Sequence, residues 1–307
     1  MKYIIIALGM IVSSGVVACD NCNVYLGINP NDFSHSVQLL HRWSFREGSF
    51  NQYGQQILRH GGMSEYHNSE LLELFSTYEV RGRVFLDERT SILASIPFRN
   101  NYRAINNVTR ADAYGLGDPL ALINFRILNS KLTDSNSVNH QLTLIGGLKL
   151  PFGKHNAEWN DKIVDHDMQP GTGSFDFISG FDYYVKVKYL GLNVSANYKM
   201  NTTNADKFRF GNRTNLMVGL FSNLKVGKLK LLPHLGTYYE LSSSDVYRNE
   251  LVEDSEVATL FSRGSLGVFF GKWSLNGEVL WRLKQKLGQT NLKEGHRFRW
   301  GLTYFFN

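Results

Sequence analysis

The feature that most constrains this chain is a period-two alternation of apolar and polar residues, which recurs from residue 36 to the end. Successive side chains of a β-strand point to opposite faces, so this period predicts strands rather than helices. Turn residues divide the alternation into twelve segments. These segments are 36–45, 71–84, 90–99, 116–128, 140–151, 174–188, 189–200, 212–226, 228–241, 258–271, 272–286 and 296–306.

The length of these segments favours a membrane over a soluble domain. Strands of soluble domains usually hold about five or six residues, whereas a tilted strand that crosses a bilayer needs about nine to eleven. The last segment has an apolar face with Trp300 and Tyr304 opposite a polar face with Arg297 and Arg299. Amphipathic rings at strand ends are typical of membrane barrels. A secreted β-sandwich shows the same alternation and stays open as the alternative.

The links between the segments alternate between short and long, as in outer-membrane barrels with short periplasmic turns and long outer loops. Tight turns are expected at 188–189, 226–228 and 271–272. We therefore expect an all-β fold, a transmembrane antiparallel up-and-down barrel of about 12 strands over residues 36–307, with ten or fourteen strands as alternatives. The links expected to face outward are 46–70, 100–115, 152–173, 201–211, 242–257 and 287–295.

Composition excludes several other classes of protein. With 43% hydrophobic residues and 6 Pro, the chain does not have the composition of a disordered protein. Only one apolar run approaches the length of a membrane-spanning helix, and it lies at the N-terminus, which argues against a polytopic helical membrane protein. Two cysteines are too few for a disulfide-rich scaffold.

The N-terminus has the pattern of an export signal. Lys2 precedes an apolar run, and small residues around Ala18 provide a cleavage site, so residues 1–18 are predicted to be a signal peptide. Residues 19–35 would then form an N-terminal periplasmic tail. Cys19 and Cys22 in this tail are candidates for lipidation or a disulfide, and a metal pair is the third interpretation. Two thiolates alone do not complete a tetrahedral metal site, and we expect no metal and no cofactor.

Three glycine-containing motifs stand in a recognisable order: GLGD at 115–118, LKLPFGK at 148–154 and GTGSFDF at 171–177. Their glycines allow tight backbone geometry where loops meet strands, and we expect a structural role for them. In this order the motifs resemble the outer-membrane barrel family of the meta-pathway of phenol degradation, over roughly residues 110–307. That resemblance implies a channel or uptake porin for small hydrophobic or aromatic compounds.

If the apolar faces meet lipid, the polar faces line the lumen, and their basic residues outnumber the acidic ones. Such an excess favours anions in a pore, unless the charges pair across the lumen or fill it. The principal candidates for lining the lumen are Arg42, Glu73, Glu79, Arg81, Arg83, Arg99, Asp118, Arg126, Lys149, Asp176, Asp182, Lys186, Lys199, His234, Glu240, Arg263, Glu278, Arg282 and Arg299. Further basic candidates are Lys188, Arg213, Lys225, Lys230, Lys284 and Arg297.

These patterns predict an outer-membrane channel or transporter for passive passage of small solutes, including hydrophobic or anionic compounds. An adhesion or structural barrel and a lipid-modifying enzyme are the alternatives. The His67-Asn68-Ser69 triplet is a weak match to the lipid-facing His and Ser of an outer-membrane phospholipase, and no further hydrolase motif is present, so no enzyme is expected. The expected partners are outer-membrane lipids, the assembly machinery that recognises the aromatic last strand, and a small solute, but not nucleic acid.

Overall fold

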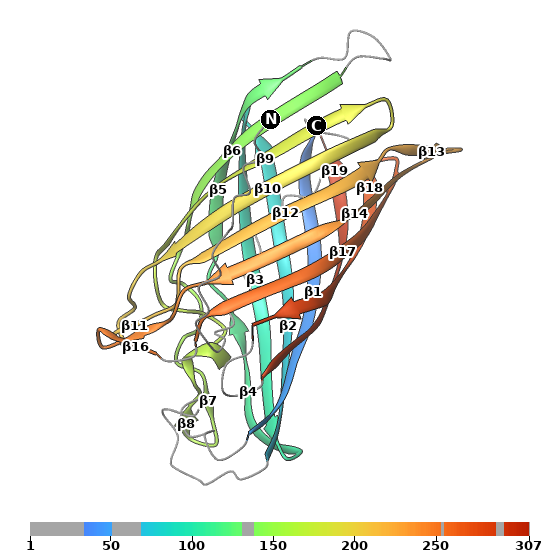
Figure 1. Cartoon of the computed structure of the whole chain (residues 1–307). Helices are drawn as coiled ribbons and strands as arrows, with labels where there is room; N and C mark the ends of the chain where they lie inside the picture. Colours follow the sequence, from blue (N-terminus) through green and yellow to red (C-terminus); the bar gives the residue numbers. More distant parts are fainter. Residues whose placement is uncertain (1–33, 51–68, 131–137, 253–254, 287–291, 307) are drawn as a thin grey trace, which may run out of the picture.

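The computed structural model describes residues 34–50, 69–130, 138–252, 255–286 and 292–306 (Figure 1). The predicted signal peptide, Cys19 and Cys22 lie outside the described residues. Within the described ranges, no helix has both the length and the apolar character needed to cross a membrane.

Twelve long antiparallel strands form the wall, which confirms the predicted fold. One of the twelve is divided into β4 and β5, and another is continued by the short β13. The wall strands are β1 (His35–Phe50), β2 (Ser69–Phe85), β3 (Thr90–Ile105), β4 (Val108–Leu116) with β5 (Leu120–Asn129), β6 (Val138–Lys149), β9 (Asp176–Val187), β10 (Leu190–Asn201), β12 (Arg213–Ser222) with β13 (Leu224–Val226), β14 (Leu229–Ser242), β17 (Val257–Phe270), β18 (Trp273–Gln285) and β19 (Lys293–Phe306).

The barrel closes where its first and last strands meet. β1 pairs with β19 in antiparallel register, from His35 opposite Phe306 to Arg42 opposite Arg299 and beyond. β12 pairs with β14 on the other side of the ring, so the wall is continuous. We call the end of the barrel that holds His35 and Phe306 the inner end, and the opposite end, where the long links lie, the outer end (Figure 1).

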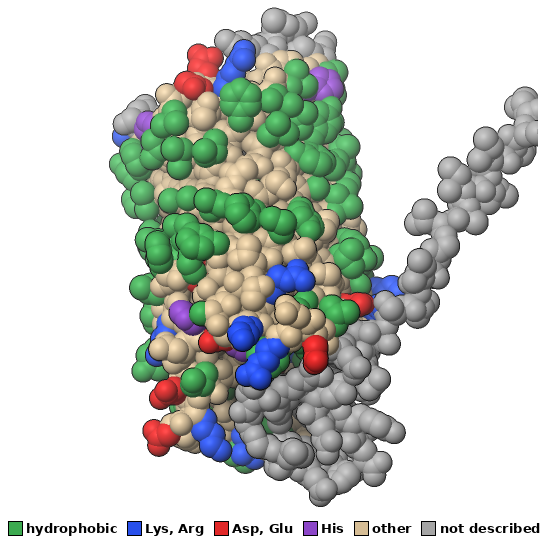
Figure 2. Space-filling model, turned by 90° about the vertical axis from the view of Figure 1, so that its left-hand side faces the viewer, with side chains coloured by type: hydrophobic (Ala, Val, Ile, Leu, Met, Phe, Trp, Pro, Cys, Tyr) green, Lys and Arg blue, Asp and Glu red, His purple; other side chains and the backbone are tan. Residues whose placement is uncertain are grey.

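The two faces of the wall differ in chemistry as the alternation predicts. Along β2, Leu72, Tyr78 and Val80 are exposed on the outside, while Glu73 and Glu79 are buried on the inside. The space-filling view shows hydrophobic side chains across the outer surface and charged ones mostly toward its ends (Figure 2). Because lipid offers no hydrogen-bond partners, an apolar outer face with complete backbone pairing is the form in which strands cross a bilayer.

The three glycine-containing motifs meet at one point of the wall, where β4 gives way to β5. Asp118 Oδ1 accepts a hydrogen bond from the Gly153 backbone N–H (3.0 Å), and its Oδ2 accepts one from the Thr172 N–H (2.7 Å). Lys149 Nζ lies 3.0 Å from Asp118 and 2.6 Å from Asp176. One buried carboxylate thus ties together all three motifs, and we call this group the motif junction.

Glycine is required at the motif junction because backbone packs directly on backbone. A Cβ atom added at Gly171 would lie 2.6 Å from the carbonyl carbon of Gly153, and one added at Gly153 would lie 2.6 Å from that of Gly117. No Cβ contact is this short in a relaxed structure, so a side chain here would force the segments apart.

Smaller elements lie at the outer end. β7 (Glu158–Trp159) pairs with β8 (Lys162–Ile163), and the 3-10 helix η2 (His166–Met168) follows them. β11 (Phe208–Arg209), β15 (Val246–Tyr247) and β16 (Glu250–Leu251) form a separate three-stranded sheet.

We predict that Gly171→Ala destabilises the barrel, because overpacking of a tight junction typically costs about 1–3 kcal/mol. Urea unfolding, followed by the loss of the faster gel mobility of the folded barrel, measures this change. Gly277→Ala is the matched control, since a Cβ atom at Gly277 meets nothing within 4 Å. Equal midpoints for the two variants would refute the role assigned to the motif junction.

Candidate functional site

The segment between β6 and β9, residues 150–175, folds into the outer part of the lumen, and we call it the inward segment. Met168 of η2 is fully buried against Phe75 of β2 and Ala111 and Ala113 of β4. Asn101, on the inner face of β3, donates side-chain hydrogen bonds to the carbonyls of Met168 and Gln169, both at 3.1 Å. The link 152–173 lies at the outer end of the barrel, as expected (Figure 1), and these contacts place Met168 and Gln169 inside the lumen.

Hydrogen bonds within the inward segment give it a defined shape. The Gln169 side chain accepts from the Ala157 N–H (2.8 Å) and donates to the Val164 carbonyl (2.8 Å). Beside them, the His166 ring stacks on Phe208 of β11 with the ring centroids 4.3 Å apart. The segment is therefore a folded unit that contacts the wall, not an extended loop.

A chain of alternating charges crosses the lumen beneath the inward segment. Successive members lie between 2.7 and 3.9 Å apart, and all are buried. In spatial order they are Arg103, Glu73, Arg46, Glu294, Arg297, Glu240 and Arg213. Groups of opposite charge this close in a poorly solvated interior attract strongly, and an unpaired member would be costly.

The inward segment is attached to this chain of charges by two carboxylates. Asp165 lies within ion-pair distance of Arg103, and Asp167 Oδ2 lies 2.8 Å from Arg103 Nη2 and 4.0 Å from Arg46 Nη2. With these two aspartates, the chain of charges comprises four guanidinium groups and five carboxylates, so the charges within it nearly balance. We call the contacts of Asp165 and Asp167 the latch.

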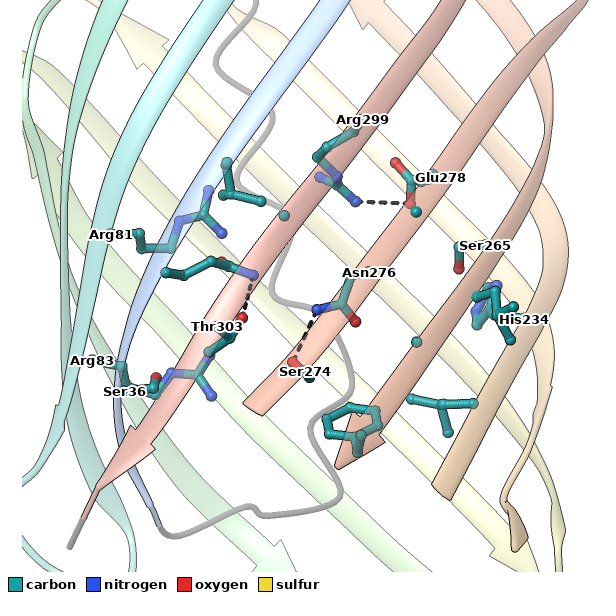
Figure 3. Close-up of a pocket in the computed structure, with 18 of the residues that line it drawn as sticks. Ser36, Arg81, Arg83, His234, Ser265, Ser274, Asn276, Glu278, Arg299 and Thr303 are labelled. Carbon is teal, nitrogen blue, oxygen red and sulfur yellow. Dashed lines mark hydrogen bonds and ion pairs between the residues drawn. The ribbon is translucent and has the colours of Figure 1, made fainter. Parts of the chain in front are cut away.

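The inner half of the lumen contains a cavity of about 120 Å³ (Figure 3). Arg81 and Arg83 reach it from β2, while Arg263 and Arg299 reach it from β17 and β19. Glu278 is the one carboxylate among the lining residues. The cavity is therefore basic, in contrast to the outer lumen.

The predicted lumen residues differ in burial. Those with buried side chains are Glu73, Glu79, Arg99, Asp118, Arg126, Lys149, Asp176, Asp182, Lys199, His234, Glu240 and Arg263. Those that are partly buried are Arg42, Arg81, Arg83, Lys186, Glu278, Arg282 and Arg299.

Several of these residues meet in three groups. Glu79 pairs with Arg42 and Arg81, and Glu278 pairs with Arg263 and Arg299. The third group is the motif junction around Asp118. Arg126 joins none of these groups, and its Nη1 donates to the Glu88 carbonyl at the inner rim (3.1 Å).

Sequence reasoning missed the residues that close the outer lumen. Arg46, Arg103 and Glu294 lie just beyond the predicted segment ends, because the strands extend past the region where one face is apolar. The charges of Arg46 and Arg103 continue the period-two spacing of the inner face, and that signal was available in the sequence. Glu294 does not, because the register of β19 shifts between Glu294 and Arg297. Asp165 and Asp167 belong to a link, where no periodicity indicates which way a side chain points.

A serine and a histidine meet on the lipid-facing wall, although they are not the pair considered from sequence. Ser69 is buried inside the barrel, whereas His41 Nε2 and Ser76 Oγ lie 2.9 Å apart on the outside. Trp300 Nε1, which can only donate, hydrogen-bonds to His41 Nδ1 (3.0 Å). The neutral ring must then carry its proton on Nε2 and donate to Ser76, so it cannot act as general base for that serine.

No group of three or more His, Cys, Asp or Glu side chains that would suit a metal ion occurs among the described residues.

Comparisons with known proteins show a shared fold. An outer-membrane channel from Pseudomonas putida F1 aligns with a TM-score of 0.62 and 12% identity, covering 91% of this chain and 100% of that one. The β domain of the Bordetella autotransporter BrkA aligns at 0.48 and 9% identity, covering 88% and 99%. A Pseudomonas aeruginosa FadL homologue aligns at 0.37 and 11% identity, covering 89% and 91%. No protein-family model and no curated protein sequence matches the chain.

The chain is an outer-membrane β-barrel. Its closed ring and its apolar outer face are those of a barrel in the outer membrane of a Gram-negative bacterium, and the likeness to a solved outer-membrane barrel shows the same fold. Unrelated functions share such folds, so function has to be argued from the lumen.

The link that follows β14 at the outer end of the barrel contains a buried carboxyl group whose pKa lies near neutral pH. Burial raises the pKa of Asp245, which follows β14, to about 7. Its Oδ1 accepts a hydrogen bond from the Gly211 N–H at 2.7 Å. The unfolded chain releases this proton near its usual pKa of about 4. The free energy of unfolding of the links around Asp245 therefore falls as the pH rises from about 4 to 7, and it stays low above that range.

We predict that hydrogen exchange of backbone amides in 204–212 and 243–252, corrected for intrinsic rates, is faster at pH 8 than at pH 5. Asp245→Asn keeps the acceptor without the charge and should show equal protection at both values. The same pH dependence in this variant would exclude Asp245 as its origin.

We also predict that Ser76 does not react with fluorophosphonate probes of serine hydrolases, and that Ser76→Ala and the unaltered barrel are labelled equally. Labelling that disappears in Ser76→Ala would show that the His41 tautomer argued above is wrong.

Proposed function

We propose that the chain is an outer-membrane channel for small solutes, whose lumen is closed at the outer end by the inward segment. A solute would enter when the latch opens and would leave through the cavity toward the periplasm. The inward segment moves without unfolding the barrel, so passage is passive and gated.

The observation that carries this proposal is the way in which the inward segment is held. β7 and β8 pair only with each other among the described strands, so no β-ladder joins them to the wall. The tip of the segment is instead held by the two aspartates of the latch, by the packing of Met168 and by hydrogen bonds from Asn101. Such contacts exchange more readily than the ladders of a closed barrel, which supports a movable closure in a permanent wall.

Two further observations support transport. The cavity lies in the inner half of the lumen and offers space for a small molecule (Figure 3). The order of the three motifs resembles the meta-pathway family, whose members are described as transporters. The motif junction anchors both ends of the inward segment, through Lys149 and Gly153 at one end and Thr172 at the other.

We predict that Asp165→Asn with Asp167→Asn raises the open probability of single channels in planar bilayers about tenfold. The double variant removes the carboxylate charges from the latch but leaves Arg103 and Arg46 paired with Glu73. Loss of one partner of a partly buried ion pair costs more than loss of an exposed one, and a tenfold change corresponds to about 1.4 kcal/mol.

Glu256→Gln is the matched control, because Glu256 pairs with Lys286 at the outer end in a partly buried contact outside the latch. Its open probability should equal that of the unaltered barrel. Absence of current from every variant would refute the channel, whereas equal current from all of them would refute the latch as its closure.

A further inference from the structure

Three neighbouring turns at the inner end of the barrel are rich in lysine. They join β9 to β10, β13 to β14 and β17 to β18, and these strands follow one another around the wall (Figure 1). Residues 184–191, 222–232 and 269–274, which include the turns, contain neither Asp nor Glu. We call their lysines the inner lysine cluster, which consists of Lys186, Lys188, Lys225, Lys228, Lys230 and Lys272.

The charges of the inner lysine cluster are not compensated within the part of the chain that the structure describes. None of the six lysines forms an ion pair there, and all except the half-buried Lys186 are exposed. Asp87 and Glu88 belong to the turn between β2 and β3, on the opposite side of the ring. The inner end is therefore basic on one side, from β9 to β18.

Two lysines of the cluster face each other across a pair of strands. Lys225 of β13 lies directly opposite Lys230 of β14, and Lys228 is in the turn between them. Like charges at directly opposite positions destabilise a strand pair. An anion beside both ammonium groups would convert this repulsion into attraction.

Lys188 occupies a backbone position that favours glycine. Its φ angle is +55°, and the corresponding positions of the other two turns hold Gly227 (+59°) and Gly271 (+57°). A residue with a Cβ atom loses free energy in this left-handed conformation. Glycine would thus suit the turn itself better, which indicates a use for the positive charge of Lys188.

The hairpin of β13 and β14 is amphipathic and extends beyond its neighbour. β10 pairs with β12 only as far as Ser222, so β13 projects past it (Figure 1). Leu224 and Val226 share one face of the hairpin with Leu229, whereas Lys225 and Lys230 are on the other. Exposed apolar side chains adjoin the lysines in all three turns, among them Tyr189, Leu190, Leu224, Val226, Phe270 and Trp273.

This combination fits a membrane surface better than a water-soluble anion. The polar layer of a bilayer adds roughly 5–7 Å on each side of the hydrocarbon core. A hairpin at this depth contacts acyl chains with its apolar face and headgroups with its basic face. Trp and Tyr side chains also prefer this layer. A polymeric anion of the cell wall would leave the apolar side chains uncovered.

We propose that the inner lysine cluster binds the headgroups of anionic phospholipids in the periplasmic leaflet of the membrane. Lys225, Lys228 and Lys230 would contact the phosphate, since an ammonium group is a compact charge that pairs well with phosphate oxygens. Lys188 and Lys272 extend the surface to the two adjacent turns. The inference goes beyond the proposed function, because lipid binding here does not require an open lumen.

Native mass spectrometry of the purified full-length barrel in detergent tests this proposal. Phosphatidylglycerol and phosphatidylethanolamine with the same acyl chains are offered in equal amounts. We expect the anionic lipid to bind at least about tenfold more tightly, because each lysine near a membrane surface attracts anionic lipid. Equal binding of the two lipids would refute the proposal.

A triple variant locates the binding surface. Lys225→Gln with Lys228→Gln and Lys230→Gln should lower the affinity for phosphatidylglycerol at least about tenfold. The matched control removes the same charge from exposed positions at the outer end, by glutamine substitution of Lys207, Lys284 and Lys293. Both variants are compared after their folded gel mobility has been verified. An equal loss in the control would overturn the assignment to the inner end.

A charge reversal separates lipid binding from the stability of the hairpin. Lys225→Glu places a carboxylate opposite Lys230, so hydrogen exchange in 224–231 should be slower than in the unaltered barrel in zwitterionic detergent. Phosphatidylglycerol should slow this exchange in the unaltered barrel but not in the variant. No effect of the lipid on the unaltered barrel would refute an anion between the two lysines.

Sedimentation with purified peptidoglycan distinguishes the lipid from the cell wall. In detergent without added phospholipid, we expect no co-sedimentation of the barrel. Co-sedimentation that disappears in the triple variant would assign the inner lysine cluster to the cell wall and overturn the proposal.

Discussion

The structure depends on one constraint: every backbone N–H and C=O group that lies in lipid must be hydrogen-bonded within the protein. The β1–β19 ladder satisfies this constraint, because it removes the two edges that an open sheet would expose. Once the ladder closes the ring, alternate residues face outward and inward. The outward set must be apolar, whereas the inward set is under no such demand and carries most of the charge.

The inward charges then face a second constraint, since buried ionised groups need partners. In the outer lumen, the alternating chain from Arg103 to Arg213 meets this demand almost fully, and the aspartates of the inward segment complete it. The inner lumen has shared carboxylates and a cavity instead. The same wall thus contains a compact part that closes the lumen and a looser part with space for a solute.

The sequence predicted the wall well because period two depends on local geometry alone. All twelve segments correspond to strands, and the interruption at 117–119, which divides β4 from β5, overlaps a glycine motif. The period-two alternation does not predict which of the inward residues contact one another across the lumen. The pairing of Glu240 with Arg297, 57 residues apart, follows from ring closure. The inward position of Asp165 and Asp167 follows from the packing of Met168, and no local pattern in residues 150–175 predicts it.

The antiparallel pairing of β1 with β19 also has a consequence for biogenesis. Gln38 and Thr303, whose side chains are hydrogen-bonded, are separated by 265 positions in the chain. Contacts of such long sequence separation form slowly. Here β1 obtains its second neighbouring strand only when β19, the last strand, pairs with it. A chain that lacked β19 would therefore leave β1 and β18 each with one unpaired edge, and lipid cannot satisfy the backbone groups of such edges.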